Sequence, residues 1–210
     1  RHKILSGAVK DDKAFEGITE IDDIWFLYSQ KGRKGLDYSR KRGGSKRAGD
    51  NDFQAKLLIT TDRNKTTDMS LARIGRLKKA DIERKVSGRF SEGCVLVSDK
   101  HRSIAAFAKS ENLKHVSFKA SEHTAGGEYH VQNINNMAAG LKTIVNRTLK
   151  GVSTKYLQNY ANWYHLRNKK ADVEEMGRML LQNKDAISLY FNREGIYKRF
   201  IENFSKRTYR

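Results

Sequence analysis

The segment 18–28 constrains the fold more than any other part of the chain, because it has the pattern of a buried strand. In an extended strand, alternate side chains point to opposite faces. One face would carry Ile18, Glu20, Asp22, Ile24, Phe26 and Tyr28, and the other Thr19, Ile21, Asp23, Trp25 and Leu27. Both faces are largely apolar, so we expect this strand to lie inside a sheet that is covered on both sides.

Each face of this strand also carries an acidic residue near its middle, Asp22 on one face and Asp23 on the other. A carboxylate in such a place is costly unless it is paired, protonated or bound to a metal. Two interpretations stay open from the strand alone. One of the aspartates ends the buried part or caps a turn, or one of them is a metal ligand whose partners lie elsewhere in the chain.

The composition favours a polyanionic partner. The chain has 42 Lys and Arg against 24 Asp and Glu, which gives a net charge of +18, and such an excess most often indicates nucleic-acid binding. No apolar run approaches transmembrane length and no signal peptide is visible, so we expect no membrane partner. The single cysteine, Cys94, excludes an internal disulfide framework and a Cys-rich zinc site, and favours a reducing, cytoplasmic and nucleoid-associated location.

The order of the elements indicates one α/β domain over residues 18–168. Residues 1–17 read as the end of an upstream region with a linker, and residues 169–210 as a helical C-terminal extension. Because the chain begins at Arg1 without Met, we expect more sequence upstream. After the first strand we expect strands at 53–61 and 66–74, a helix at 78–86, a strand at 94–98, a helix, a strand at 113–118, a loop at 121–128, a helix at 130–149, and a last helix with Ser153 as its N-cap.

The segment 31–50 is strongly basic, with eight basic residues, two acidic ones and five glycines. Such a stretch cannot bury enough apolar surface to fold alone. It is either a solvated loop or a DNA-contacting arm that becomes ordered on binding. Its candidate DNA-contacting residues are Lys31, Arg33, Lys34, Arg40, Lys41, Arg42, Lys46 and Arg47.

Two later positions are candidates for the same site. Asp99 follows the apolar run 94–98, as expected for a buried parallel strand whose carboxyl end delivers a ligand, although Asp99 could instead be the N-cap of the next helix. Asn135 and Lys142 are seven residues apart on the predicted long helix, so they lie about 20° apart and roughly 10 Å along its axis. They flank an apolar stripe and are either ordinary surface residues or face one cleft.

The order of elements is that of a ribonuclease H-like mixed sheet, with three antiparallel strands plus parallel strands, flanked by helices. The sequence Glu20-Ile-Asp22-Asp23-Ile-Trp-Phe26 resembles the Glu-x-Asp-Glu-x-aromatic-aromatic strand of the ISXO-type insertion-sequence transposases, prokaryotic relatives of Merlin elements. Val97-Ser98-Asp99 is similar to their second acidic strand. His130-Val-Gln-Asn-Ile-Asn135 with Leu141-Lys142 resembles their third motif, and Val152-Ser153-x-Lys155-x-Leu157-x-x-Tyr160 with Arg167 resembles their closing helix.

The resemblance covers about residues 1–168 and implies a DDE-type transposase, a two-metal-ion polynucleotidyl transferase. It implies that Asp22, Asp99 and Asn135 are catalytic and bind two Mg²⁺ ions, with Mn²⁺ as a substitute, and that Lys142 follows as the basic residue. Asp23 stands where the family usually has Glu and is expected to have no catalytic role. The chain also departs from the family pattern at Gln132, Ala138 and Trp163.

The partners that the resemblance implies are double-stranded DNA, as transposon ends and as target, and further copies of the chain in a homodimer or higher oligomer. His130, Lys142, Lys155 and Arg167 are further candidate DNA contacts. Two alternatives stay open from the sequence. The first is a domesticated module that binds DNA without cutting it, and the second is a structure-selective nuclease of the same superfamily.

Overall fold

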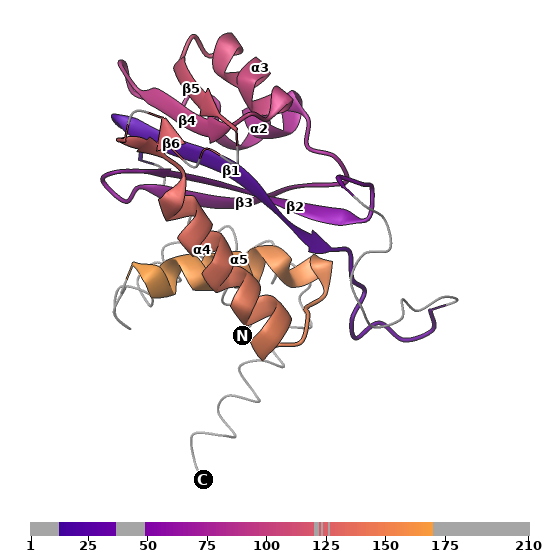
Figure 1. Ribbon diagram of the computed structural model, residues 1–210. Coiled ribbons are helices and arrows are strands. Elements are labelled where there is room, and N and C mark those ends of the chain that lie inside the picture. Colours follow the sequence, from indigo (N-terminus) through magenta and orange to yellow (C-terminus); the bar gives the residue numbers. More distant parts are fainter. Residues whose placement is uncertain (1–12, 37–48, 120–121, 123, 126, 170–210) are drawn as a thin grey trace, which may run out of the picture.

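The computed structural model describes residues 13–36, 49–119, 122, 124–125 and 127–169, and its centre is a five-stranded sheet. The strand order across the sheet is β3-β2-β1-β4-β5. β1, β2 and β3 pair in antiparallel fashion, whereas β4 runs parallel to β1 and β5 parallel to β4. This confirms the expected ribonuclease H-like mixed sheet, with β1 at its centre (Figure 1). The strands are β1 (Ile18–Leu27), β2 (Gln54–Asp62), β3 (Thr67–Ile74), β4 (Val95–Asp99) and β5 (Lys114–Phe118).

Helices cover both faces of the sheet (Figure 1). The helices α2 (Lys79–Val86) and α3 (Arg102–Ser110) lie on one face, and α4 (Gln132–Lys142) and α5 (Leu157–Asn168) on the other. The core under α4 and α5 includes Ile24, Phe26, Leu57, Ile59, Ile134, Leu141, Leu157 and Ala161. The core under α2 and α3 includes Phe15, Ile21, Leu58, Ile82, Leu96, Ile104 and Phe107.

The predicted stripe on the long helix is buried at Ile134, Ala138, Leu141 and Val145, as expected. The helix itself changes geometry after α4, continuing as the π-helix η1 (Thr143–Thr148). The last helix also begins differently, because Ser153 precedes a 3₁₀ turn, η2 (Thr154–Tyr156), and makes no side-chain capping bond. β6 (Thr124–Ala125), in the predicted loop, and β7 (Tyr129–His130), just after it, form a short antiparallel ladder that the sequence did not indicate, and the long helix begins at Gln132 instead of at residue 130.

The second half of β1 departs from the expectation of a strand covered on both faces. β4 pairs with β1 only from Ile18 to Glu20, so the described strands leave the later part of β1 paired with β2 alone. Ile21 belongs to the core under α2 and α3, but Trp25 does not and is 42% exposed. The alternating pattern is correct, but the helical layer stops short of this end of the strand.

One side chain of α5 covers part of the sheet edge formed by β3. β3 is an edge strand, and the Gln158 side-chain oxygen accepts a hydrogen bond from the Leu71 backbone N–H at 2.6 Å. The amide nitrogen of Gln158 donates to the Met69 carbonyl at 2.8 Å. Unpaired backbone groups on an edge strand are a template for association with other strands. Gln158 therefore joins α5 to β3 and occupies part of that edge.

Several predicted segments lie outside the described residues, namely 1–12, most of the basic segment (37–48), and all but Lys169 of the helical extension at 169–210. Within the part of the chain that the structure describes, no helix has the length and apolar character needed to cross a bilayer.

Candidate active site

Asp22 and Asp99 lie side by side on adjacent parallel strands. The pairing of β1 with β4 ends where Glu20 meets Val97, and each aspartate stands two residues after that pair. Continuing the parallel register brings Asp22 and Asp99 to the same level, at the carboxyl end of β4. Ligand sites of open α/β sheets gather at such ends. The central strand and the strand that follows α2 thus deliver two carboxylates to one place.

The electrostatics of Asp22 reflect this crowding. Burial, followed by the charges of Asp99 and Asp23, raises the pKa of Asp22 from 3.8 to about 7. The Asp23 backbone N–H, which donates to Asp22 Oδ1 at 2.7 Å, lowers the pKa, as does Lys142, but neither outweighs the burial. A carboxyl group whose ionised form is penalised by burial and by like charges gains most from a bound cation.

Asp99 does not cap the helix that follows it, although its position in the sequence made it a candidate N-cap. The helix α3 begins at Arg102 with His101 at its N-cap, so Asp99 lies upstream of the cap. Its Oδ1 atom is buried, and no described group forms a hydrogen bond with it. Burial raises the pKa of Asp99, with a smaller effect from Asp23 in the same direction, while His101 lowers it. A buried carboxylate oxygen without a donor needs a partner, and a cation would supply one.

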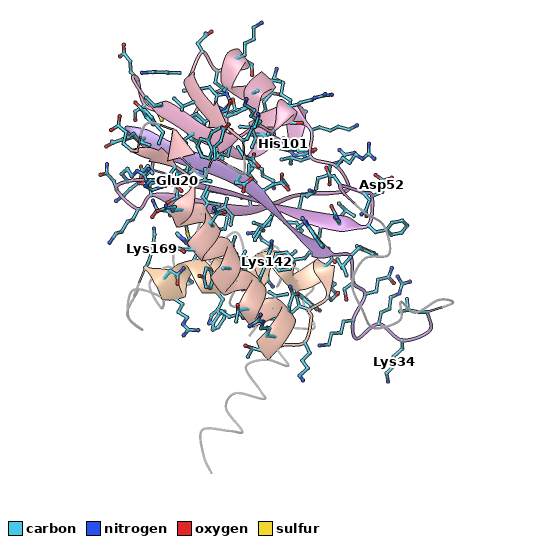
Figure 2. The ribbon with its side chains drawn as sticks, viewed as in Figure 1. Glu20, Lys34, Asp52, His101, Lys142 and Lys169 are labelled. Carbon is cyan, nitrogen blue, oxygen red and sulfur yellow. The ribbon has the colours of Figure 1, made fainter. Side chains whose placement is uncertain are left out.

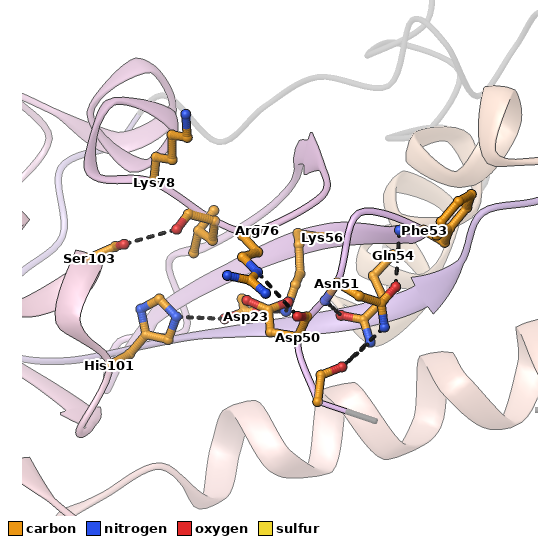
Figure 3. Close-up of polar contacts among 12 residues, drawn as sticks. Asp23, Asp50, Asn51, Phe53, Gln54, Lys56, Arg76, Lys78, His101 and Ser103 are labelled. Carbon is orange, nitrogen blue, oxygen red and sulfur yellow. Dashed lines mark hydrogen bonds and ion pairs between the residues drawn. The ribbon is translucent and has the colours of Figure 1, made fainter. Parts of the chain in front are cut away.

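Asp23 differs from its neighbour because it is already paired (Figure 3). Its Oδ2 accepts a hydrogen bond from Lys56 Nζ at 2.9 Å, and its Oδ1 lies 3.9 Å from His101 Nε2. Lys56 also forms an ion pair with Asp50 at 2.8 Å. Burial alone would lower the pKa of Lys56, but the hydrogen bonds to Asp50 and Asp23 raise it. Of the two adjacent aspartates, Asp23 is committed to a structural ion pair.

Glu20 connects β1 to the start of α4. Its carboxylate is 1% exposed and accepts hydrogen bonds from Asn133 Nδ2 at 2.6 Å and from the Ile134 backbone N–H at 3.1 Å. It also forms an ion pair with Arg63, which donates in addition to the Glu128 carbonyl at 3.0 Å. A carboxylate at a helix N-terminus satisfies free N–H groups and complements the helix dipole. Glu20 therefore fixes where α4 begins relative to the central strand (Figure 2).

Lys142, at the other end of α4, lies near Asp22. It is the last residue of that helix, is half-buried, and lies near enough to Asp22 to lower the pKa of that residue. Its Nζ is 6.0 Å from the centre of the Trp25 ring. Asn135 lies in the first turn of α4, one residue after the backbone contact with Glu20, and its side chain is exposed. The metal-binding role of Asn135 stays a prediction.

The candidate DNA contacts from the basic segment have different surroundings. Arg40, Lys41, Arg42, Lys46 and Arg47 lie outside the described residues. Lys34 is exposed, and Arg33 is exposed with Nη1 3.3 Å from Gln30 Oε1. Lys31 instead donates from Nζ to the carbonyl oxygens of Leu149 at 2.9 Å and Gly151 at 2.7 Å. Lys31 therefore holds the end of η1 against the end of β1.

The remaining candidate contacts lie on the face that carries α4 and α5. Lys155 and Arg167 are exposed, and their charged groups lie 5.0 Å from the Tyr156 ring and 5.8 Å from the Trp163 ring, respectively. His130 is half-buried, with Nδ1 3.5 Å from Glu20 Oε1. Its surroundings therefore belong to the Glu20 cluster at the start of α4, and its predicted contact with DNA stays a prediction.

The donor set suits a hard divalent cation. Within the described ranges, no three His, Cys, Asp or Glu side chains converge into a ready-made metal site. The predicted set, however, contains two carboxylates and one amide, and Mg²⁺ usually keeps several waters or phosphate oxygens as its other ligands. The raised pKa of Asp22 and the orphaned oxygen of Asp99 both fit a cation bound between them. Asp22 and Asp99 are thus the residues of this site that could hold one.

The sequence did not reveal the cations that pair with the acids of β1. Lys56 lies within the predicted second strand and Arg63 in the turn after it, and neither was singled out. A lysine inside an apolar strand was nevertheless a signal, since a buried ammonium needs a partner. Register then places Lys56 opposite Trp25 and next to Asp23. The partnership of Glu20 with Asn133 had no comparable signal, because it joins segments more than a hundred residues apart.

Comparison with known proteins gives one family. The model of the ISXO2-like transposase domain matches residues 14–168. No curated protein is a significant match to the sequence.

Solved structures give weak similarities. The crystal structure of the Mos1 strand transfer complex has 9% identity and a TM-score of 0.31, covering 87% of this chain and 62% of that one. The Mos1 transposase paired-end complex with the left transposon end has 12% identity and a TM-score of 0.31, at the same coverages. The Drosophila P element transposase strand transfer complex has 11% identity and a TM-score of 0.27, covering 88% of this chain and 52% of that one.

Proposed function

The chain belongs to the ISXO2-like transposase family, and on this premise we propose that it is a catalytic domain that cuts and joins transposon-end DNA. The observation that carries the proposal is the position of Asp22 and Asp99, level with each other at the carboxyl end of β4, with Lys142 near Asp22. Paired carboxylates can hold the metal ions that stabilise the attacking and leaving oxygens of a phosphoryl transfer, and an ammonium can pair with a phosphate of the DNA.

Divalent metal ions are the general cofactors of this class of enzyme, and the acids of the site fit them. Asp22 and Asp99 would supply hard carboxylate oxygens, and Asn135 a neutral amide oxygen. Mg²⁺ bound there would stabilise the charge that develops on the attacking and leaving oxygens of an in-line displacement. Because Asn135 carries no charge, we expect it to hold its ion more weakly than a glutamate would.

The chain's own groups position the DNA for this reaction. Lys142 presents an ammonium beside Asp22, where it would pair with a phosphate next to the scissile bond as a point charge. Glu20 holds the start of α4, and thereby the backbone next to Asn135, against β1. Asp23 stays bound to Lys56 and keeps its carboxylate out of the reaction. In the first step water would attack the phosphorus at the transposon end and break its bond to the 3′ oxygen, which leaves a 3′-hydroxyl on the transposon and a 5′-phosphate on the flanking strand. That hydroxyl would then attack a target phosphorus and displace a target 3′-hydroxyl, without a covalent enzyme intermediate.

The predicted partners follow from the charge and the family. The net charge of +18 suits the phosphates of double-stranded DNA, as transposon end and as target. Joining two ends to one target requires two active sites that act together, so we propose a homodimer or higher oligomer. The proposed location is cytoplasmic and nucleoid-associated.

The test is a cleavage and joining assay with the full-length protein. Labelled terminal-repeat DNA and a supercoiled target plasmid are incubated with Mg²⁺ or Mn²⁺, beside Asp99→Asn as the inactive control. Joined product that disappears in the control supports the transposase. Cleavage without joining would replace it with a structure-selective nuclease. Binding without either reaction would leave a DNA-holding module.

A further inference from the structure

Trp25 is more exposed to solvent than the other side chains of the central strand. Its neighbours in β1, Ile24 and Phe26, point to the opposite face and are 4% and 5% exposed, whereas Trp25 is 42% exposed. It is not the tip of a loop, since its strand is paired with β2 from Thr19 to Leu27. The strand therefore presents a large aromatic face to solvent from a rigid backbone.

The indole lies near the candidate active site but starts from the other face of the strand. Trp25 lies three residues after Asp22, so strand alternation places it on the face of Asp23, on the part of β1 that extends past its last pairing with β4. The Lys142 ammonium is 6.0 Å from the centre of the indole ring, and its helix α4 packs on Ile24 and Phe26, on the face of β1 that carries Asp22. Lys142 thus connects the exposed aromatic ring with the face of the strand that carries Asp22.

The contact between Lys142 and Trp25 does not by itself account for the exposed ring. A separation of 6.0 Å is at the outer limit for a cation–π interaction, and such contacts contribute little at exposed sites. Lys142 can therefore turn to a phosphate without a large loss. The ring and the ammonium together offer the two contacts that a nucleotide uses, a flat apolar face for the base and a positive charge for its phosphate.

We propose that Trp25 and Lys142 form a nucleotide subsite, in which an unpaired base of the DNA end stacks on the indole beside the scissile phosphate. This inference rests on the proposed function, because it places the base by reference to Asp22 and Asp99. An unpaired base is required, since a base inside a duplex is covered by its neighbours and has no free face to stack on an aromatic ring. Trp25 would stabilise the opened end of the transposon and hold its strand in line with the site.

The first test uses tryptophan fluorescence, which does not depend on catalysis. The sequence has two tryptophans, Trp25 and Trp163, so the full chain with Trp163→Phe carries Trp25 as its sole reporter. This variant is titrated, without metal, with a single-stranded oligonucleotide and with the same strand carrying abasic sites in place of its bases. Stacking should quench the emission with the intact strand and leave it nearly unchanged with the abasic strand. Equal emission changes for the two strands would overturn the subsite.

The second test measures affinity in variants. Trp25→Ala should weaken binding of the single strand by roughly 5- to 100-fold, as expected from the loss of one stacked base, with Trp25→Tyr in between. Binding of a closed duplex of the same length should stay unchanged. Phe53→Ala is the matched control, because it removes another exposed aromatic side chain, 53% exposed, from the same sheet region. Equal affinity of Trp25→Ala and the parent protein for the single strand would refute the proposal.

The two tests separate this inference from the proposed function. If the parent protein joins DNA in an Asp99-dependent manner while Trp25→Ala binds and joins normally, the subsite is refuted and the transposase stands. If the parent binds the single strand with Trp25-dependent quenching but never cuts DNA, the proposed function is refuted, and the subsite survives as a binding site for unpaired DNA.

Discussion

At the scale of single residues, the site is defined by the different environments of neighbouring acids. Asp22 is buried beside two other carboxylates, and no described basic side chain lies within ion-pair distance of it. Asp23, the next residue, is bound to Lys56, and Glu20 is bound to Arg63 and to the start of α4. Because alternate residues of a strand point to opposite faces, Asp22 and Asp23 have different surroundings although they are adjacent. The carboxylate of Asp23 stabilises the fold, and that of Asp22 destabilises it.

These environments predict opposite effects for two adjacent substitutions. Because the folded state raises the pKa of Asp22 from 3.8 to about 7, the folded protein binds more protons than the unfolded chain between these values. The free energy of unfolding of the metal-free protein should therefore fall as pH rises from about 4 to 7. Asp22→Asn should remove the part of this dependence that comes from Asp22, while the raised pKa of Asp99 keeps its own part, and it should stabilise the protein at pH 8 by roughly 1–3 kcal/mol, less than the full shift implies.

Asp23→Asn is the matched control for that prediction. It leaves the buried Lys56 ammonium with Asp50 as its remaining acidic partner, so it should destabilise the protein by roughly 1–3 kcal/mol at pH 8. Urea denaturation of both variants and the parent at pH 5 and pH 8 measures these differences. Destabilisation by Asp22→Asn at pH 8 would contradict the account of Asp22.

At the scale of elements, the site depends on how α4 is held against the sheet. Glu20 fixes its first turn, and Tyr164 of α5 lies against Gly140 near its C-terminal end. After β1 ends, Lys31 Nζ donates to the Gly151 carbonyl at 2.7 Å and the Ser29 N–H donates to Thr154 Oγ1 at 2.8 Å, which ties down the segment between η1 and α5. The helix that carries Asn135 and Lys142 is thus fixed at both ends by contacts from the central strand and the residues that follow it.

The contact at the first turn predicts a local as well as a global effect. Glu20→Ala removes the acceptor for Ile134 and the partner of the Arg63 guanidinium, so stability should fall by about 3–5 kcal/mol. Hydrogen exchange of the Ile134 amide should accelerate more than that of Leu141, farther along the same helix. Glu16→Ala, an exposed acid on the same stretch of chain, should change neither measurement by much. Unchanged protection at Ile134 would show that Glu20 does not hold α4.

The close approach of α4 and α5 predicts an unusual response to alanine. A Cβ atom added at Gly140 would lie 2.0 Å from Tyr164 Oη and 2.8 Å from Cζ, and Tyr164 is 8% exposed. Gly140→Ala should therefore destabilise the protein by about 1–3 kcal/mol by overpacking, although alanine favours a helix.

A double variant tests whether this clash is the cause. Gly140→Ala combined with Tyr164→Leu should cost less than the sum of the two single substitutions in a denaturation experiment. Asn136→Ala, at an exposed position of the same helix, should change stability little. Strict additivity of Gly140→Ala and Tyr164→Leu would contradict a direct contact.

The elements show how far the sequence could predict this site. The alternation in β1 and the apolar run before Asp99 were sufficient to predict β1 and β4, because a buried strand leaves a strong pattern of apolar residues in the sequence. The exposure of Trp25 was not predictable, since it depends on where β4 and the helices end rather than on β1 itself. The pairing of Glu20 with α4 also had no local signal, because the partners meet only in the folded chain.

At the scale of the whole molecule, a strongly basic protein surrounds a small acidic centre. The excess of 18 positive charges attracts DNA at long range, while Asp22 and Asp99 repel phosphate unless a cation lies between them. Substitutions should therefore affect DNA binding and metal binding independently. The basic surface residues determine most of the affinity for DNA, and the two aspartates determine most of the affinity for metal.

Two lysines of the segment after β1 should differ in their contribution to DNA binding. Lys34 is exposed, so Lys34→Ala should reduce the slope of log K against log salt for duplex DNA by up to about 0.9. Lys31 is engaged with the carbonyl groups at the end of η1, so Lys31→Ala should lower stability and leave the slope nearly unchanged. Fluorescence anisotropy at several salt concentrations checks this. The reverse order of slopes would contradict these roles.

We propose that Asp22 and Asp99, but not Asp23, hold a divalent cation. Calorimetric titration of the DNA-free protein with Mn²⁺ at pH 6, 7 and 8 tests this claim, with the fold of each variant checked by circular dichroism. The parent should bind Mn²⁺ more tightly as pH rises and release a proton near pH 7, because the pKa of Asp22 is about 7 and binding requires its ionised form. Asp22→Asn and Asp99→Asn should each weaken binding at least about tenfold, whereas Asp23→Asn should retain it. Undiminished binding in Asp22→Asn or Asp99→Asn, or its loss in a folded Asp23→Asn, would contradict the claim.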